Sequence, residues 1–246
     1  MIIEEHIPIY YVIRLGDEHM TLVTFNRNLP KVGESIEEPS QELIETSLNL
    51  RQVSLEDAVR YGGPITREAL GAVKLHGDRK YVVVDTKVHL LMPGWIPAIP
   101  GWHTDGVPRG EDMNPAGKGK PNMKAQVEEL VTPPRYHILV TGTHCPTLFM
   151  NEQKDFDVNL ELDSDLYSNL TRQINDLNKD FETFSTPAST VVEWDWWNLH
   201  TAQQATGRGW RYLIRVAETD HIVPRTNPAD FIRTQNQVYS PPDFGW

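Results

Sequence analysis

The stretch YVVVDTKVHLLMPGWIPAIPGWHTDG, residues 81–106, contains the strongest indications of both fold and function. Residues 81–92 are dense in β-branched and aromatic side chains and end at a Pro-Gly pair, which predicts a β-strand. Beyond the break, His103 and Asp105 stand two residues apart, with a glycine close on each side. On extended backbone, side chains at i and i+2 point to the same side. The imidazole and the carboxylate can therefore face one common point.

Strand-like segments also dominate the sequence that follows. They are short apolar or alternating runs at residues 136–150 (with a break near Gly142 and Pro146), 156–162, 189–194 and 210–216. Most lie too close together for the helical crossovers that parallel strands need. We therefore expect a β-rich α+β protein with a few flanking helices.

Three segments have helical character, and each follows a serine suited to cap it. They are residues 41–48 after Ser40, residues 55–61 after Ser54, and residues 166–181 after Ser164. In the third segment Leu166, Leu170, Ile174, Leu177 and Phe181 recur at helical spacing, as they do on one apolar face.

The composition is that of a globular protein with one domain. The 246 residues are 39% hydrophobic and 23% charged, and no apolar run approaches the ~18 residues that span a bilayer. We expect a single domain with N-terminal helices and strands in residues 1–79, a core in 80–217 and a tail in 218–246.

The net charge and the cysteine content indicate which binding partners and which cellular compartment to expect. A net charge of −11 disfavours non-specific nucleic-acid binding, which needs basic residues to neutralise phosphates. The start lacks the basic and apolar pattern of a secretory signal, and the single cysteine, Cys145, fits a reducing environment. We expect a cytoplasmic protein without membrane attachment, and the sequence does not indicate its oligomeric state.

A second histidine turns the His-x-Asp pair into a candidate metal site. His200 ends another strand-like stretch, 97 residues beyond His103. Two histidines and one carboxylate form the facial triad of non-haem Fe(II) enzymes, which leaves coordination positions open for substrates. Zinc is the competing metal, because its catalytic sites use the same ligand types.

Arginines on the last predicted strand suggest an anion-binding cavity. Arg211 and Arg215 share one face of residues 210–216, while the other face is apolar. A buried guanidinium requires an anion, and its geometry suits a bidentate carboxylate. At about 3.3 Å per residue the two arginines stand ~13 Å apart along the strand, so they cannot both bind one carboxylate.

Together, His103, Asp105, His200 and Arg211 resemble, in order and spacing, the motif of the Fe(II)/2-oxoglutarate-dependent dioxygenase family. The resemblance covers about residues 80–217. It implies a double-stranded β-helix, which is a jelly-roll, cupin-like core, with Fe(II) held by His103, Asp105 and His200. It further implies that 2-oxoglutarate chelates the iron and places its far carboxylate on Arg211, with O2 as the other cosubstrate. The products would be succinate, CO2 and, as the usual outcome, a hydroxylated substrate.

Further contacts to the cosubstrate are expected from side chains near this motif. Arg215 is a candidate cosubstrate or substrate contact, with a structural ion pair as the alternative. Tyr136, Thr143 and Thr147 follow the long loop and could hydrogen-bond the far carboxylate. The gap between the two histidines is wider than in many family members, and the loop after Asp105 matches no subfamily pattern.

Two other functions compatible with the same residues stay open. One is a cupin-like metal enzyme that does not use 2-oxoglutarate, and the other is a non-catalytic jelly-roll protein with a binding or structural role. The alternatives for single residues are His89 or His137 as competing metal ligands and Cys145 as a nucleophile rather than a buried apolar side chain.

The substrate is the least defined part. The basic residues Arg109, Lys118, Lys120 and Lys124 follow Asp105 and form either a solvated surface or a lid that recognises an anionic substrate, such as a nucleotide. The overall acidity favours a small molecule over nucleic acid.

Overall fold

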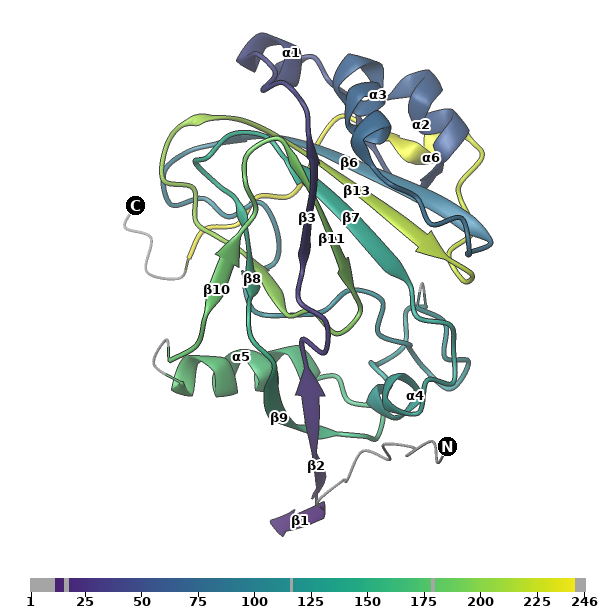
Figure 1. Ribbon diagram of the computed structural model, residues 1–246, viewed down its shortest axis with the longest axis vertical. Helices are drawn as coiled ribbons and strands as arrows, with labels where there is room; N and C mark the ends of the chain where they lie inside the picture. Colours follow the sequence, from purple (N-terminus) through teal and green to yellow (C-terminus); the bar gives the residue numbers. More distant parts are fainter. Residues whose placement is uncertain (1–11, 16–17, 116, 178–179, 242–246) are drawn as a thin grey trace, which may run out of the picture.

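The computed structural model describes residues 12–15, 18–115, 117–177 and 180–241 (Figure 1). The two ends of the expected single domain, residues 1–11 and 242–246, lie outside the described residues. The strands are β1 Val12–Leu15, β2 Glu18–Phe25, β3 Lys31–Ser35, β4 Asn49–Leu50, β5 Val53–Ser54, β6 Tyr81–Leu91, β7 Arg135–Val140, β8 Thr147–Met150, β9 Lys154–Asn159, β10 Thr183–Ser185, β11 Thr190–Asp195, β12 His200–Ala202, β13 Gly209–Thr219 and β14 Ile232–Arg233. The helices are α1 Gln41–Glu45, α2 Leu55–Tyr61, α3 Gly63–Ala72, α4 Met123–Val127, α5 Leu166–Asp176 and α6 Pro228–Phe231.

The main element is a six-stranded antiparallel sheet in the order β3-β11-β7-β13-β6-β5. Its centre is the long pairing of β6 with β13, which runs from Leu91 opposite Gly209 to Tyr81 opposite Thr219. Because Tyr81 has a partner at position 219, β13 continues two residues past the expected core boundary at 217. The sheet also takes β3 and β5 from the first 79 residues, whose helices and strands we had expected to pack on the core.

A smaller sheet, in the order β10-β8-β12, lies beside it. The segment around His103 extends this sheet through an antiparallel bridge to His200, the first residue of β12. From β6 onward the chain passes back and forth between the two sheets. The described residues thus form a β-rich fold with a large antiparallel sheet, which is compatible with a jelly roll. The remaining strands form two minor sheets, β1-β2-β9 and β14-β4.

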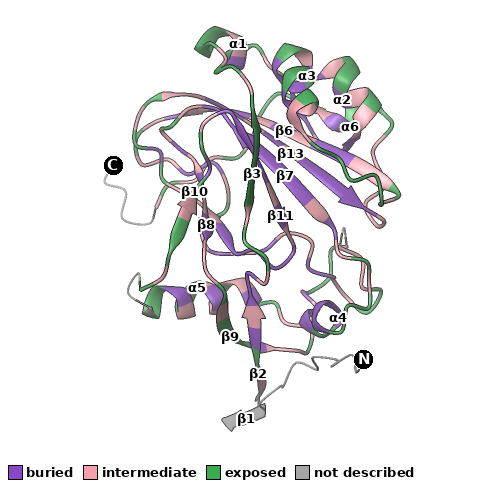
Figure 2. Cartoon of the chain, in the orientation of Figure 1, coloured by how far each residue is buried: buried purple, intermediate pink, exposed green. Residues whose placement is uncertain are grey.

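The two faces of the large sheet pack against different partners. Tyr212, Ile214 and Val216 of β13 belong to the apolar cluster that includes residues of α1, α2, α3 and α6, such as Ile65. Figure 1 shows these helices over one side of β6 and β13, and Figure 2 shows the central strands mostly buried and β3 exposed. The opposite face therefore looks inward, toward the smaller sheet, and carries the alternate residues of each strand.

All three expected helices are present, although the first ends at Glu45 rather than at residue 48, and one cap differs. The Ser40 and Ser54 hydroxyls accept hydrogen bonds from the amides of Leu43 and Asp57, which confirms both as N-caps. The prediction of Ser164 as a cap was wrong, because α5 begins at Leu166 with Asp165 in the N-cap position.

Helix α5 is also shorter than expected, since it ends at Asp176. Leu177 and Phe181 nevertheless pack against the same apolar cluster as α5. Spacing alone therefore identified the buried side chains correctly but overestimated the length of the helix. None of the helices within the described ranges has the length and apolarity that crossing a bilayer requires.

Candidate metal centre

The three residues of the sequence motif converge in the fold. His103, Asp105 and His200 each offer one ligand atom, and these atoms all lie within 4.8 Å of one another. The backbones of the two histidines are paired directly: the His103 amide donates to the His200 carbonyl at 3.0 Å, and the His200 amide donates to the His103 carbonyl at 2.9 Å. The closeness of the two imidazoles thus follows from strand pairing across 97 residues of sequence.

Both imidazoles are oriented in the same way. Nδ1 of His103 lies 3.2 Å from the Gly101 carbonyl oxygen, and Nδ1 of His200 lies 3.1 Å from the Asn198 carbonyl oxygen. Since a carbonyl only accepts, each Nδ1 carries the proton, which leaves each Nε2 as a lone-pair donor. Protein ligands to metals are commonly fixed in this way, through a hydrogen bond from the other ring nitrogen.

The surroundings favour a neutral His200. Phe149 and Trp194 lie against its ring, with centroid distances of 5.2 and 5.7 Å. Burial, together with the neighbouring His103, lowers the pKa of His200 to about 4. At neutral pH this imidazole is therefore unprotonated and able to bind a metal cation.

Asp105 is held as a carboxylate by an arginine. Burial opposes its ionisation, but Arg215 and the two imidazoles outweigh that effect and hold the pKa of Asp105 well below its usual range. Arg215 donates to Asp105 at 3.0 Å and to Asp85 of β6 at 3.1 Å. Arg215, which we had considered as a cosubstrate contact, thus forms the ion pair that was its alternative role. The contact fixes the orientation of Asp105.

The residue after Asp105 has to be glycine. Gly106 has φ +81°, a backbone conformation that L side chains rarely adopt. A Cβ here would overlap the Tyr136 hydroxyl and the Pro134 ring. Tyr136 in turn stacks on Trp194, at a centroid distance of 5.2 Å. The close approach of β7 to this turn therefore depends on the missing side chain.

Two pockets meet at the candidate centre, and His103 and Tyr167 line both. The larger has a volume of about 1180 Å³ and lies between residues 97–103, α5 and the tail segment 233–239. The smaller, about 250 Å³, is lined by Asp105, Tyr136 and Arg215 and by Arg109 of the long loop. Asp105 lines only the smaller pocket and His200 lines neither, so the candidate centre is reached from the side of His103 and Asp105.

Arg211 and Thr147, two of the predicted cosubstrate contacts, line neither pocket. Arg211 is 2% exposed, and its Nε donates to the Cys145 carbonyl at 2.7 Å. Thr147 is buried in β8, where its amide donates to the Thr186 hydroxyl. Arg211 is nevertheless close enough to the inner face of β6 to influence Lys87 and His89 electrostatically.

Lys87 is a pocket residue that the sequence analysis missed. It lines the larger pocket, as does His89, from the inner face of β6. The signal was present in the sequence, because Asp85, Lys87 and His89 alternate with apolar or small residues along one strand. Three polar side chains on one face of a strand whose other face is apolar indicate a polar cavity.

The other candidates have structural partners. Cys145 is fully buried, its thiol donates to the Gln203 carbonyl, and burial raises its pKa, all of which suits a packed side chain better than a nucleophile. Nε2 of His137 lies 3.0 Å from Glu218. Lys118, Lys120 and Lys124 are exposed.

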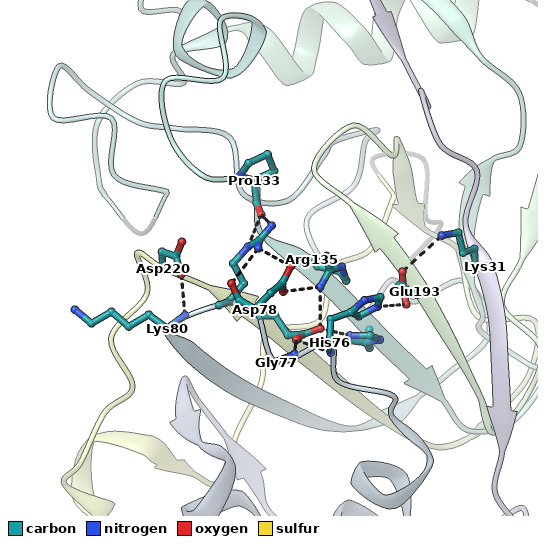
Figure 3. Close-up of polar contacts among 12 residues, drawn as sticks. Lys31, His76, Gly77, Asp78, Lys80, Pro133, Arg135, Glu193 and Asp220 are labelled. Carbon is teal, nitrogen blue, oxygen red and sulfur yellow. Dashed lines mark hydrogen bonds and ion pairs between the residues drawn. The ribbon is translucent and has the colours of Figure 1, made fainter.

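The Glu218 carboxylate is the centre of a separate polar cluster, and its partners His76, Gly77 and Arg135 are labelled in Figure 3. It is 1% exposed, and it accepts hydrogen bonds from the amides of His76 and Gly77, from His137 and from Arg135. Burial favours its protonated form, but these donors outweigh burial and lower the pKa of Glu218. The cluster ties residues 76–78 to β7 and β13 and uses the full acceptor capacity of the carboxylate.

Comparison with known proteins adds no assignment. Neither a protein-family model nor a curated protein sequence matches this chain. The function has to be inferred from the geometry of the site.

Proposed function

We propose that this chain is an Fe(II)- and 2-oxoglutarate-dependent oxygenase that oxidises a small or anionic substrate. The observation that carries the proposal is the convergence of His103, Asp105 and His200 within 4.8 Å. Two imidazole nitrogens and one carboxylate, beside two pockets that His103 lines, are the donor set and the access that a facial-triad iron centre needs.

The path of the chain supports the same proposal. The chain crosses repeatedly between two sheets: β6, β7, β11 and β13 lie in the large sheet, and the His103 segment, β8, β10 and β12 lie in the small one, with β9 of a third sheet between β8 and β10. This alternation is how a jelly-roll double-stranded β-helix is built. Both histidines then lie in the small sheet, on adjacent segments, and Arg215 reaches Asp105 from the large sheet.

In this proposal Fe(II), when bound, supplies oxygen activation, and 2-oxoglutarate supplies the electrons for it. The residues of the chain bind and position these groups. His103 and His200 present Nε2, and Arg215 keeps Asp105 ionised and fixed in orientation. Phe149 and Trp194 cover one side of His200 and exclude water there. Tyr136 offers a hydroxyl whose pKa burial raises, so it stays protonated. The buried single cysteine fits a reducing compartment, and we propose the cytoplasm.

An anaerobic titration tests the proposal directly. Purified protein receives Fe(II) and then 2-oxoglutarate, and the visible charge-transfer band of the chelate is recorded. We expect the band in the wild-type protein and its loss in His103→Ala and in His200→Ala. A wild-type spectrum that does not change when both compounds are present would reject the proposal.

A second candidate function is a metal enzyme of cupin type that does not use 2-oxoglutarate. The observation that favours it is the position of Arg211, which the motif assigns to the cosubstrate but which lines neither pocket. The titration separates the two functions, because the second predicts metal binding without a chelate band.

A further inference from the structure

Two polar side chains that line the larger pocket, His89 and Lys87, have no hydrogen-bond or ion-pair partner within the described ranges. His89 is 3% exposed, and neither of its ring nitrogens has a hydrogen-bond partner among the described residues, although the backbone of Gln237 lies near. Lys87 is half-buried and forms no hydrogen bond or ion pair with the described part of the chain. Both side chains line the pocket that extends to His103. Buried polar groups are nearly always satisfied, so the buried His89 ring, with the half-buried Lys87 beside it in the same pocket, indicates a ligand.

The local charge gives the sign of that ligand. In the register of β6 with β13, Asp85 lies opposite Arg215, Lys87 opposite Leu213 and His89 opposite Arg211. Arg215 is neutralised by Asp85 and Asp105. Lys87 and Arg211 are diagonal neighbours on the two strands, because Lys87 lies opposite Leu213, two residues from Arg211. Neither forms an ion pair with an acidic residue in the described ranges. Burial, followed by the charge of Arg215, lowers the pKa of Lys87, although the carboxylates of Asp85 and Asp105 offset part of this effect.

The spacing along the strand gives the size of the ligand. Asp85 and Arg215 mark the level of the metal ligands, because Arg215 contacts both Asp85 and Asp105. At about 3.3 Å per residue, Lys87 stands ~7 Å further along β6 and His89 ~13 Å further. A short dianion with one end at the metal therefore reaches the level of Lys87 first. Arg211, at the level of His89, contributes positive potential from outside the pocket wall.

We propose that Lys87 and His89 form the receptor for the far carboxylate of the dicarboxylic 2-oxo acid cosubstrate, with Arg211 behind them. This inference rests on the proposed oxygenase function and assigns the specificity of its cosubstrate site. The Lys87 ammonium pairs with the carboxylate, and the neutral His89 ring donates one N–H to it. The motif had assigned this role to Arg211.

The inference is tested by equilibrium binding in the absence of any primary substrate. Fe(II)-loaded wild-type protein and Lys87→Met are titrated anaerobically with 2-oxoglutarate, and Kd is obtained from the charge-transfer band. Removing one charge-assisted contact should weaken binding roughly 10- to 100-fold. Lys87→Gln should show the same loss and serves as the second variant if Lys87→Met is poorly folded. Affinity for Fe(II) alone should be unchanged in both.

Arg172→Met is the matched control. Arg172 lines the same pocket from α5, and its removal should leave the Kd for 2-oxoglutarate unchanged. A Lys87→Met Kd equal to the wild-type value overturns the inference and leaves the proposed function standing. Equal losses in Lys87→Met and Arg172→Met also overturn it, since they would reflect the general potential of the pocket. A wild-type protein without the band overturns both proposals.

Discussion

The turn at Gly106 offers a test of the site geometry that does not depend on any ligand. Replacing Gly106 by alanine adds one methyl group at φ +81°, directly against Tyr136 and Pro134. Gly77 is a matched control, because it also has a positive φ, +71°, but a Cβ there would meet nothing within 4 Å. Gly71 is a second control, since it lies on the exposed side of α3 with open space around it and without a positive φ.

The three substitutions separate two contributions to stability. At Gly77 only the backbone conformation matters, and the expected loss is about 1–2 kcal/mol. At Gly106 overpacking adds about 1–3 kcal/mol. Summed, the loss is about 2–5 kcal/mol, or ~4–20 °C in Tm at roughly 2–4 °C per kcal/mol for a domain of this size. Gly71→Ala should instead stabilise the helix by up to about 1 kcal/mol.

Thermal and urea unfolding followed by circular dichroism measure these differences. The decisive quantity is the gap between Gly106→Ala and Gly77→Ala, which isolates the packing of β7 on the turn. Equal stability of these two variants would contradict the placement of Tyr136 and Pro134 against the residue that follows Asp105. In that case the geometry described for the carboxylate would also have to be abandoned.

Three further predictions concern individual contacts. The pKa of Glu218 is lower in the fold than its ordinary value of 4.5, so its contribution to stability is complete above about that pH and is lost as the pH falls through the folded-state pKa. Glu218→Gln should lower the free energy of unfolding at neutral pH by about 1–3 kcal/mol and should reduce its dependence on acidic pH. Urea denaturation at several pH values measures both effects. The same loss of stability at low pH in the variant and in the wild-type protein would exclude Glu218 as its source. Arg215→Met leaves the Asp105 carboxylate without its cation, and a bound Mn(II) would replace that lost positive charge. Mn(II) should therefore raise the Tm of the variant more than that of the wild-type protein, and equal increases in Tm would contradict the ion pair. Tyr212→Phe removes a buried 2.8 Å hydrogen bond to Thr66 and should cost about 1 kcal/mol by urea denaturation, and no more, because the Thr66 hydroxyl keeps the Gly62 carbonyl as acceptor.

The three residues of the candidate metal centre could be picked out from the sequence because most of their signal is local. His103 and Asp105 are two residues apart on extended backbone, and His200 directly follows another strand-like stretch. The β-character of residues 81–92 and the break near Gly142 and Pro146 were equally local, and the structure confirms both. Such predictions depend only on the alternation of side chains along one segment.

The remaining features depend on pairing between distant segments. No local pattern shows that β3 joins the edge of the large sheet beside β11, because all five of its residues are exposed. Alternation placed Arg211 correctly on the inner face of β13, but it could not show that Cys145 of a neighbouring loop would bind its Nε and that the side chain would lie behind the pocket wall. The alternation of Asp85, Lys87 and His89 was visible in the sequence, but the register of β6 with β13, which sets this face beside Arg211 and Arg215, was not.

The direct backbone pairing of His103 with His200 has a consequence for how such a centre is assembled. Two reciprocal amide–carbonyl hydrogen bonds hold the imidazoles side by side, so the positions of these two side chains are set by the fold before any ion binds. A cation bridging these segments would then act as a removable cross-link between parts of the polypeptide that are remote in sequence. A chelator should therefore remove such an ion while both sheets stay folded.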